Sequence, residues 1–175
     1  MEFEQVLYLR RTTRKYQTMQ IQESDLQKIL DAAQTAPLAA GDDKTTHITV
    51  VQEPTLVNRI REVTQLTSRK TGNLLDPFYG APTIIFLSAT DLSEDCIEYA
   101  NVGCVIENMI LQATALNLGS TYIWGCLGKL RNHTELMQKM EIPTRYTILS
   151  ALAIGYPTIP LEKREKKVKI SINRL

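Results

Sequence analysis

The sequence predicts one domain, spanning residues 1–175, of the α/β or α+β class, with helices packed around one sheet. Amphipathic helical patterns alternate along the chain with short apolar strands, which is typical of such sandwiches. The long helical pattern at 98–118 is apolar around most of its girth, so we expect it to be buried centrally or in a subunit interface. The chain has no internal repeat or linker, and 175 residues suit one core rather than two.

Each expected element has its own pattern. The helices carry apolar residues three or four positions apart, whereas 83–88 is a nearly continuous apolar run typical of a central strand. Segments 39–46 and 71–79 and the region around Gly125 and Gly128 predict loops. The expected helices cover 3–10, 26–33 (with a start near Ser24), 56–66, 98–118 and 134–140, and the expected strands cover 47–52, 83–88, 121–124 and 146–154.

Two helix ends carry cap signals. Ser24 followed by Gln27 has capping-box spacing, so we expect the Ser24 hydroxyl to cap the second helix. Gly119 directly follows the long apolar pattern and is the expected C-cap of that helix.

The overall charge and composition argue against several classes of protein. Twenty Lys and Arg residues against 19 Asp and Glu give a net charge of +1, so no global charge favours nucleic acid or an anionic membrane. No stretch is apolar enough to span a bilayer, and the amino terminus does not read as a signal peptide, so we expect a cytoplasmic protein. Cys96, Cys104 and Cys126 lack C-x-x-C spacing, so we expect reduced, partly buried thiols and no metal site.

Two basic clusters lie at opposite ends of the chain. If folding brings them together they form a pocket for a phosphate dianion, because arginine gives paired charge-assisted hydrogen bonds to phosphate. The alternative is a solvated turn and a solvated tail, and composition alone favours that alternative. The clusters are Arg10, Arg11, Arg14 and Lys15 in the first, and Lys163, Arg164, Lys166 and Lys167 in the second.

Five motifs in a fixed order resemble the nitroreductase family. They are RRTTRKY at 10–16 with the helix and Ala36-Pro37 that follow, FYGAP at 78–82 before an apolar strand, ALNLGS at 115–120, YIWG at 122–125, and GYP at 155–157 before a basic tail. Each motif alone is weak, but together they span nearly the whole chain. The resemblance implies an α+β three-layer sandwich with a four- or five-stranded, mainly antiparallel sheet flanked by helices, in an intertwined dimer with the helix at 98–118 at its seam.

The resemblance also implies an FMN site shared between two subunits. Carried over by position, Arg10 contacts the flavin phosphate and Thr12 lies beside the ribityl chain or pyrimidine ring, with Arg11 in the same basic turn. Arg14 faces the N1–C2=O edge, where a fixed cation stabilises the negative charge that reduction places there.

The rest of the implied site comes from later in the chain. The backbone around Tyr122, Trp124 and Gly125 approaches the flavin N5 edge, and Arg164 and Lys166 complete the phosphate site. Two interpretations of Trp124 stay open, a core aromatic or a residue stacking on a ring. Tyr79 is likewise either a wall of the substrate pocket or a structural residue.

The sequence departs from the family pattern after Pro37. Gly41 stands where the family has an asparagine, and Asp43 where it has a glutamine. Gly41 offers only its backbone, and an ionised Asp43 can accept from the flavin N3–H but cannot donate to O4. A carboxylate near the ring also opposes the charge of reduced flavin.

The predicted function is that of an FMN-dependent oxidoreductase. We expect a homodimer that takes electrons from NAD(P)H and passes them to a small flat acceptor, nitroaromatic or quinone-like, by ping-pong kinetics with no catalytic side chain. One alternative is an FMN-binding sensor or carrier without rapid turnover. Another is a nucleic-acid or acidic-protein binder using the basic tail, which the lack of interleaved aromatic residues disfavours.

Overall fold

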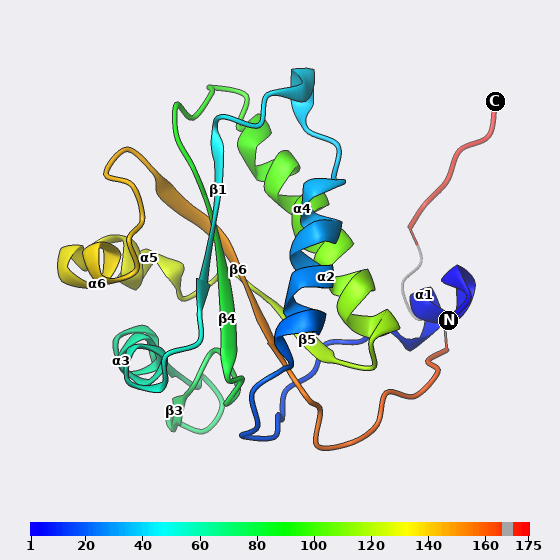
Figure 1. The fold of residues 1–175 in the computed structure, drawn as a ribbon, viewed down its shortest axis with the longest axis horizontal. Helices are drawn as coiled ribbons and strands as arrows, with labels where there is room; N and C mark the ends of the chain where they lie inside the picture. Colours follow the sequence, from blue (N-terminus) through cyan, green and yellow to red (C-terminus); the bar gives the residue numbers. More distant parts are fainter. Residues whose placement is uncertain (166–169) are drawn as a thin grey trace.

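The computed structural model describes residues 1–165 and 170–175, and its centre is one antiparallel sheet of four strands (Figure 1). The strand order is β1-β4-β6-β5, and every neighbouring pair is antiparallel. All seven residues of β4 are buried, which confirms the central strand expected from its apolar run. The strands are β1 (Thr46–Val51), β4 (Thr83–Ala89), β5 (Gly119–Ile123) and β6 (Thr147–Gly155).

Helices cover both faces of the sheet and give the three layers of an α+β sandwich (Figure 1). α2 (Glu23–Gln34) and α4 (Ile97–Ala115) lie on one face, over a core that includes Ile85, Leu87 and Leu152. α3 (Pro54–Thr64), α5 (Leu127–Arg131) and α6 (Thr134–Lys139) lie on the other, over Phe86 and Ala153. Alternate side chains of the same strands therefore point into the two cores.

Four small elements complete the chain. α1 (Phe3–Leu9) lies to one side of the sandwich, close to the carboxyl-terminal segment (Figure 1). The 3-10 turn η1 (Ala39–Gly41) lies beyond the first residues of α4, and the two-residue strands β2 (Leu66–Thr67) and β3 (Leu74–Leu75) pair inside a segment expected to be partly irregular.

The cap predicted at Gly119 is wrong. α4 ends at Ala115, and Asn117 takes the left-handed conformation (φ +59°) that closes the helix, with the Leu118 amide donating to the Ala113 carbonyl at 2.8 Å. Gly119 begins β5 instead. A Cβ at this position would lie 2.7 Å from the Thr13 side chain, so the glycine allows residues 12–13 to approach the strand.

Two further local predictions differ from the structure. α2 begins at Glu23, one residue before the expected cap, and its N-cap Gln22 makes no side-chain capping bond, so Ser24 lies within the first turn. Residues 127–131 form α5 rather than loop, because Leu127 and Leu130 lie one turn apart and are fully buried. That burial outweighs the poor helix propensity of Gly128.

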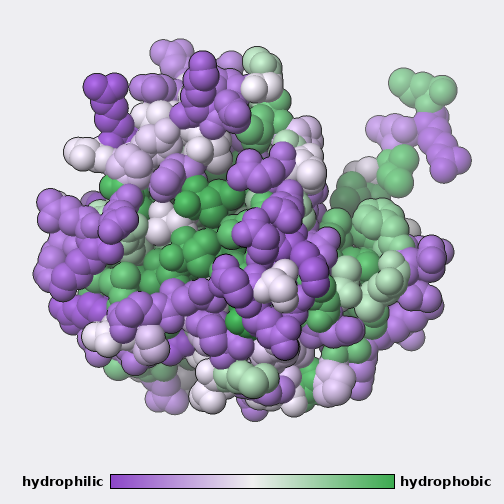
Figure 2. Space-filling view, viewed as in Figure 1, coloured by the Kyte–Doolittle hydropathy of each residue, from purple (hydrophilic) through white to green (hydrophobic). Residues whose placement is uncertain are grey.

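The surface is hydrophilic over much of the face in Figure 2, but apolar atoms show in a patch around β1 and again at α1 and the carboxyl-terminal segment. Phe3 and Leu7 of α1 are 66% and 42% exposed, and Ile170 and Ile172 are 79% and 76% exposed.

No described helix is long and apolar enough to cross a membrane. Of the three free cysteines only Cys126 is buried, whereas the partial burial expected for Cys96 and Cys104 is wrong.

Candidate functional site

The amino-terminal basic segment is attached to the outer edge of β5 by an isolated bridge. Thr12 bridges Ser120 in parallel, and the Thr13 amide donates to the Ser120 carbonyl at 2.9 Å. The Thr121 hydroxyl donates to the Thr13 carbonyl. Thr13 is buried against Gly119, whereas Arg11, Thr12 and Arg14 on either side of it are exposed. The sheet edge therefore holds a row of cations in a fixed backbone register.

Tyr16 anchors the end of this strand. Its hydroxyl lies 2.9 Å from Thr121 Oγ1 and donates to the Ala153 carbonyl at 3.3 Å. Burial raises the pKa of Tyr16 above its ordinary value, outweighing the lowering effect of the Thr121 hydrogen bond. The phenol is therefore neutral at physiological pH and acts as a structural anchor.

The carboxyl-terminal basic segment returns to the same place. The Gln17 amide donates to the Tyr156 carbonyl at 2.8 Å, and the Thr158 amide to the Lys15 carbonyl at 3.2 Å. Further along, the Arg164 amide donates to the Tyr8 carbonyl of α1 at 3.0 Å. Arg164 is thereby brought beside the end of α1, where half-buried Arg10 leaves the helix.

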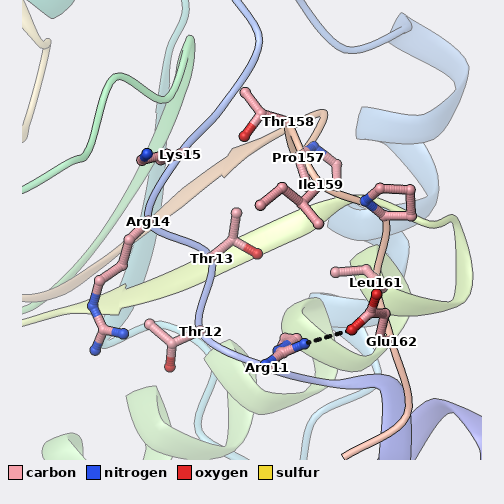
Figure 3. Close-up of a pocket in the computed structure, with 11 residues that line it drawn as sticks. Arg11, Thr12, Thr13, Arg14, Lys15, Pro157, Thr158, Ile159, Leu161 and Glu162 are labelled. Carbon is pink, nitrogen blue, oxygen red and sulfur yellow. Dashed lines mark ion pairs between the residues drawn. The ribbon is translucent and has the colours of Figure 1, made fainter.

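An open cavity of about 390 Å³ lies between the two segments (Figure 3). Arg11 points to Glu162, with 3.9 Å between guanidinium and carboxylate, and the Lys163 ammonium lies 5.2 Å from the centre of the Tyr8 ring. The segments that carry the two basic clusters thus lie side by side, and the tail lines the cavity with residues 157–162. Lys166 and Lys167 lie outside the described residues.

Arg14 also lines this cavity, and its side chain extends away from Thr13 and Thr158 (Figure 3). Its guanidinium carbon lies 5.9 Å from the centre of the Tyr79 ring, within range of a cation–π contact. Arg14 pairs with no carboxylate in the part of the chain that the structure describes. Its positive charge therefore remains available to an anionic ligand.

The end of β5 presents the second group of predicted residues. Tyr122 is 45% exposed with its hydroxyl 2.8 Å from Ser150 Oγ, and Trp124 is 62% exposed, which excludes the core interpretation of this tryptophan. Gly125 is exposed, and its amide donates to no residue within 1–165 or 170–175. Thr12 and Thr13 bond to Ser120, so the basic segment meets β5 two residues before Tyr122 in the sequence.

Gly41 and Asp43 do not join this group within one chain. The η1 turn is held at the opposite end of the sandwich, where the Ala39 amide donates to Asn101 Oδ1 at 2.9 Å (Figure 1). The helix from Asn101 to Ala115 rises by about 21 Å at 1.5 Å per residue. Gly41 and Asp43 therefore lie at the end of the sandwich opposite Arg14.

Sequence patterns leave the role of Tyr79 open and do not single out Asp76 or Arg61. Asp76, four residues before a glycine and followed by a proline, is the kind of signal that marks a side-chain-capped turn. Its two carboxylate oxygens accept from the Phe78 amide at 2.9 Å and the Gly80 amide at 2.7 Å.

No group of three or more His, Cys, Asp or Glu side chains among the described residues could hold a metal ion.

Comparison with known proteins finds relatives by sequence and by fold. The model of the nitroreductase family matches residues 7–156. A protein of Archaeoglobus fulgidus named "Putative NADH dehydrogenase/NAD(P)H nitroreductase" is 28% identical over 154 residues, covering 87% of this chain and 83% of that protein.

Two solved structures share the fold over its whole length. A nitroreductase with bound FMN from Bacteroides fragilis has a TM-score of 0.81 and 26% identity, and covers 99% of this chain and 100% of that one. An FMN-dependent nitroreductase from Clostridium difficile has a TM-score of 0.76 and 24% identity, with 99% of each chain covered. The family model matches most of the chain, and the structure places the basic segment on β5 with the tail beside it. The chain therefore belongs to the nitroreductase family.

Proposed function

We propose that the protein is an FMN-dependent oxidoreductase that takes electrons from NAD(P)H and passes them to a small flat acceptor, nitroaromatic or quinone-like. The observation that carries the proposal is the meeting of two basic segments at the edge of β5, beside exposed Tyr122, Trp124 and Gly125. Bound FMN in the Bacteroides fragilis relative and the nicotinamide enzyme named for the Archaeoglobus fulgidus relative support it.

The residues present fit the polar parts of FMN. A phosphate dianion matches the cations gathered between α1 and the tail, where Glu162 is the one carboxylate that pairs with them among the described residues. In this proposal Arg10, Arg11 and Arg164 hold the phosphate, and Thr12 lies along the ribityl chain. Arg14 faces the N1–C2=O edge, where its unpaired charge offsets negative charge. The remaining predicted ligand, Lys166, falls outside the described residues.

FMN, when bound, supplies the two-electron carrier between NAD(P)H and the acceptor. The chain's own residues bind and orient it, and no side chain is assigned as nucleophile or acid–base catalyst. The free amide of Gly125 can donate to the N5 edge, and Tyr122 and Trp124 shape the adjoining surface. Because donor and acceptor use the same exposed face in turn, we expect ping-pong kinetics. Protons come from solvent, since the phenol of Tyr16 is buried, neutral and already bonded.

We also propose that the active form is a homodimer with a site built from both copies. Gly41 and Asp43 lie at the end of the sandwich opposite Arg14. The exposed apolar residues of α1 and 170–175 also make a surface that a second copy can cover. α4, with Tyr99 and Cys104 on its uncovered side, is the proposed seam.

An absorption spectrum of the purified protein with FMN tests the proposal, recorded before and after anaerobic addition of NADH or NADPH. Prompt bleaching of the bound flavin, restored by a quinone or nitroaromatic, is the expected result. Bound flavin that stays oxidised would favour the sensor or carrier alternative, in which Asp43 disfavours reduction. A protein that retains no FMN would contradict the proposed site.

A further inference from the structure

The turn before β4 holds a tyrosine in a backbone conformation that tyrosine rarely adopts. Tyr79 has φ +56°, and Gly80 after it has φ +80°. The left-handed region is unfavourable for a bulky side chain and persists only where the surroundings fix it. Asp76 fixes it here, because its carboxylate accepts from the amides on both sides of Tyr79, Phe78 at 2.9 Å and Gly80 at 2.7 Å.

Arg61 ties this turn to α3. Its Nε lies 3.5 Å from Asp76 Oδ2, and its Nη2 donates to the Ala81 carbonyl at 2.5 Å. Nη1 donates to Asn58 Oδ1 within the helix at 3.1 Å. On the inner side Phe78 is fully buried, edge-on to Phe86 with 6.2 Å between ring centres. The turn is therefore fastened to a helix and to the core, and Tyr79 has little freedom to move.

The ring of Tyr79 is directed at Arg14, with 5.9 Å between the guanidinium carbon and the ring centre. A carboxylate in this place would hold Arg14 but would neutralise its charge and occupy its donors. An aromatic ring orients the guanidinium and leaves both the charge and the donors available.

The same turn also lies near the loop after β5. The charge of Asp76 contributes to the raised pKa of Cys126, about 11, although burial of the thiol is the larger cause. Cys126, which directly follows Gly125, belongs to the same buried cluster as Phe78, and Tyr79 packs against that cluster. The turn that contacts Arg14 therefore shares a core with the loop after β5.

We propose that Tyr79 is a positioning residue for Arg14, and that Asp76 and Arg61 hold Tyr79 in place. The proposal rests on the proposed function, in which Arg14 faces the N1–C2=O edge of FMN. Tyr79 acts through Arg14: it sets how closely the cation approaches that edge, and thereby the midpoint potential of the bound flavin.

A double-mutant cycle on the midpoint potential of bound FMN tests the coupling, using Tyr79→Leu, Arg14→Ala and both together. Tyr79→Leu should make the potential more negative and weaken FMN binding roughly two- to fivefold, the effect of losing a cation–π contact. In the Arg14→Ala background it should change neither quantity. Tyr79→Phe keeps the ring and should match the wild type. A potential unchanged by Tyr79→Leu, or shifted equally with and without Arg14, would overturn the proposal.

Arg61→Ala tests the support of the turn, with Arg59→Ala as the matched control on the exposed side of the same helix, where Arg59 pairs with Glu62. Arg61→Ala should shift the potential in the same direction as Tyr79→Leu, and Arg59→Ala should not. If Arg61→Ala does not fold, Arg61→Gln, which loses the ion pair and can still donate to Ala81, serves in its place. A wild-type potential in the folded variant would overturn the role of Arg61.

A measurement on FMN-free protein separates this inference from the proposed function. The NMR resonance of the Arg14 Nε–H group should carry a ring-current shift that Tyr79→Leu removes and Tyr79→Phe retains. A wild-type protein that fails to bind FMN contradicts the proposed function but leaves this contact testable. Absence of the shift in the wild type overturns the inference even if FMN binds.

Discussion

The two ends of the sandwich carry predicted site residues but are held in different ways. At one end, residues 12–17 are bonded to β5 and to the chain after β6, so the cations have a fixed register. At the other, η1 is exposed and includes Ala40 and Gly41 at positive φ, with Asp42 and Asp43 facing solvent. One chain thus presents a fixed cationic segment at one end of the sandwich and, beyond the opposite end of α4, an exposed loop. In the proposed dimer, that loop serves the site of the partner copy.

The largest expected effect comes from breaking the attachment of the basic strand. Gly119→Ala places a Cβ 2.7 Å from the buried Thr13 side chain, so the strand must move away from β5. We expect a loss on the order of 2 kcal/mol in the free energy of unfolding and FMN binding weaker by roughly tenfold or more. Urea unfolding and FMN titration measure the two.

Gly128→Ala is the matched control for that substitution. Gly128 is exposed in α5, and an added Cβ meets nothing within 4 Å. It should raise the free energy of unfolding by about 0.5–1 kcal/mol and leave FMN affinity unchanged. Equal FMN affinity in Gly119→Ala and Gly128→Ala would show that the register of the basic strand does not matter for binding.

The next effect comes from removing one cation of the fixed end. Arg10→Ala should weaken FMN binding roughly tenfold or more, because a charge-assisted hydrogen bond contributes about 1.5–3 kcal/mol. Fluorescence titration with FMN at low salt measures the change. Arg145→Ala, an exposed arginine in the loop before β6, is the control and should bind as the wild type does. Unchanged affinity in Arg10→Ala would place the phosphate elsewhere.

Sequence patterns predicted most of the fold because they record burial. The apolar run at 83–88 and the apolar girth of 98–118 became the central strand and the longest helix, since both are enclosed on most sides. Helix ends were predicted less well. Ser24 and Gly119 carry the usual cap signals, yet α2 starts without a side-chain cap and Asn117 ends α4. Cap residues compete with tertiary contacts, here the close approach of Thr13 to Gly119.

The candidate site likewise has one part that the sequence predicts and another part that it does not. The resemblance gives residues at 10–14 and 122–125 as parts of one predicted site, and the structure bonds Thr12 and Thr13 to β5, the strand that leads into 122–125. The Arg61–Asp76–Tyr79 arrangement could not, because it joins a helix, a turn and Arg14 through side-chain geometry that no periodic pattern records. The separation of Gly41 and Asp43 from Arg14 is likewise a property of the folded sandwich.

A smaller effect is expected at the exposed end. Asp43→Asn removes a negative charge that, in the two-copy site, lies near the flavin ring of the partner subunit. The midpoint potential of bound FMN should become less negative by an amount equivalent to a few-fold change in relative affinity for the reduced form. Spectroelectrochemical titration measures it, with Glu62→Gln on the exposed face of α3 as a charge-matched control. An unchanged potential in Asp43→Asn would argue against a contribution from the exposed loop.

The smallest expected effect is on the stability of the fold, without an effect on FMN binding. Glu53 caps α3 by accepting from the Thr55 amide at 2.8 Å and the Leu56 amide at 2.6 Å, and these backbone hydrogen bonds lower the pKa of its carboxyl group. A carboxyl whose folded-state pKa lies below its unfolded-state pKa stabilises the fold above the unfolded value and loses that contribution as pH falls through the folded value. The wild type should therefore melt slightly higher than Glu53→Gln near pH 7, and the difference should disappear as the pH falls below the folded-state pKa of Glu53. Because Glu53 lies two turns of α3 before Arg61, Glu53→Gln should leave FMN affinity unchanged at pH 7. A loss of FMN affinity together with the cap would mean that the whole of α3, and not Arg61 alone, holds the turn that carries Tyr79.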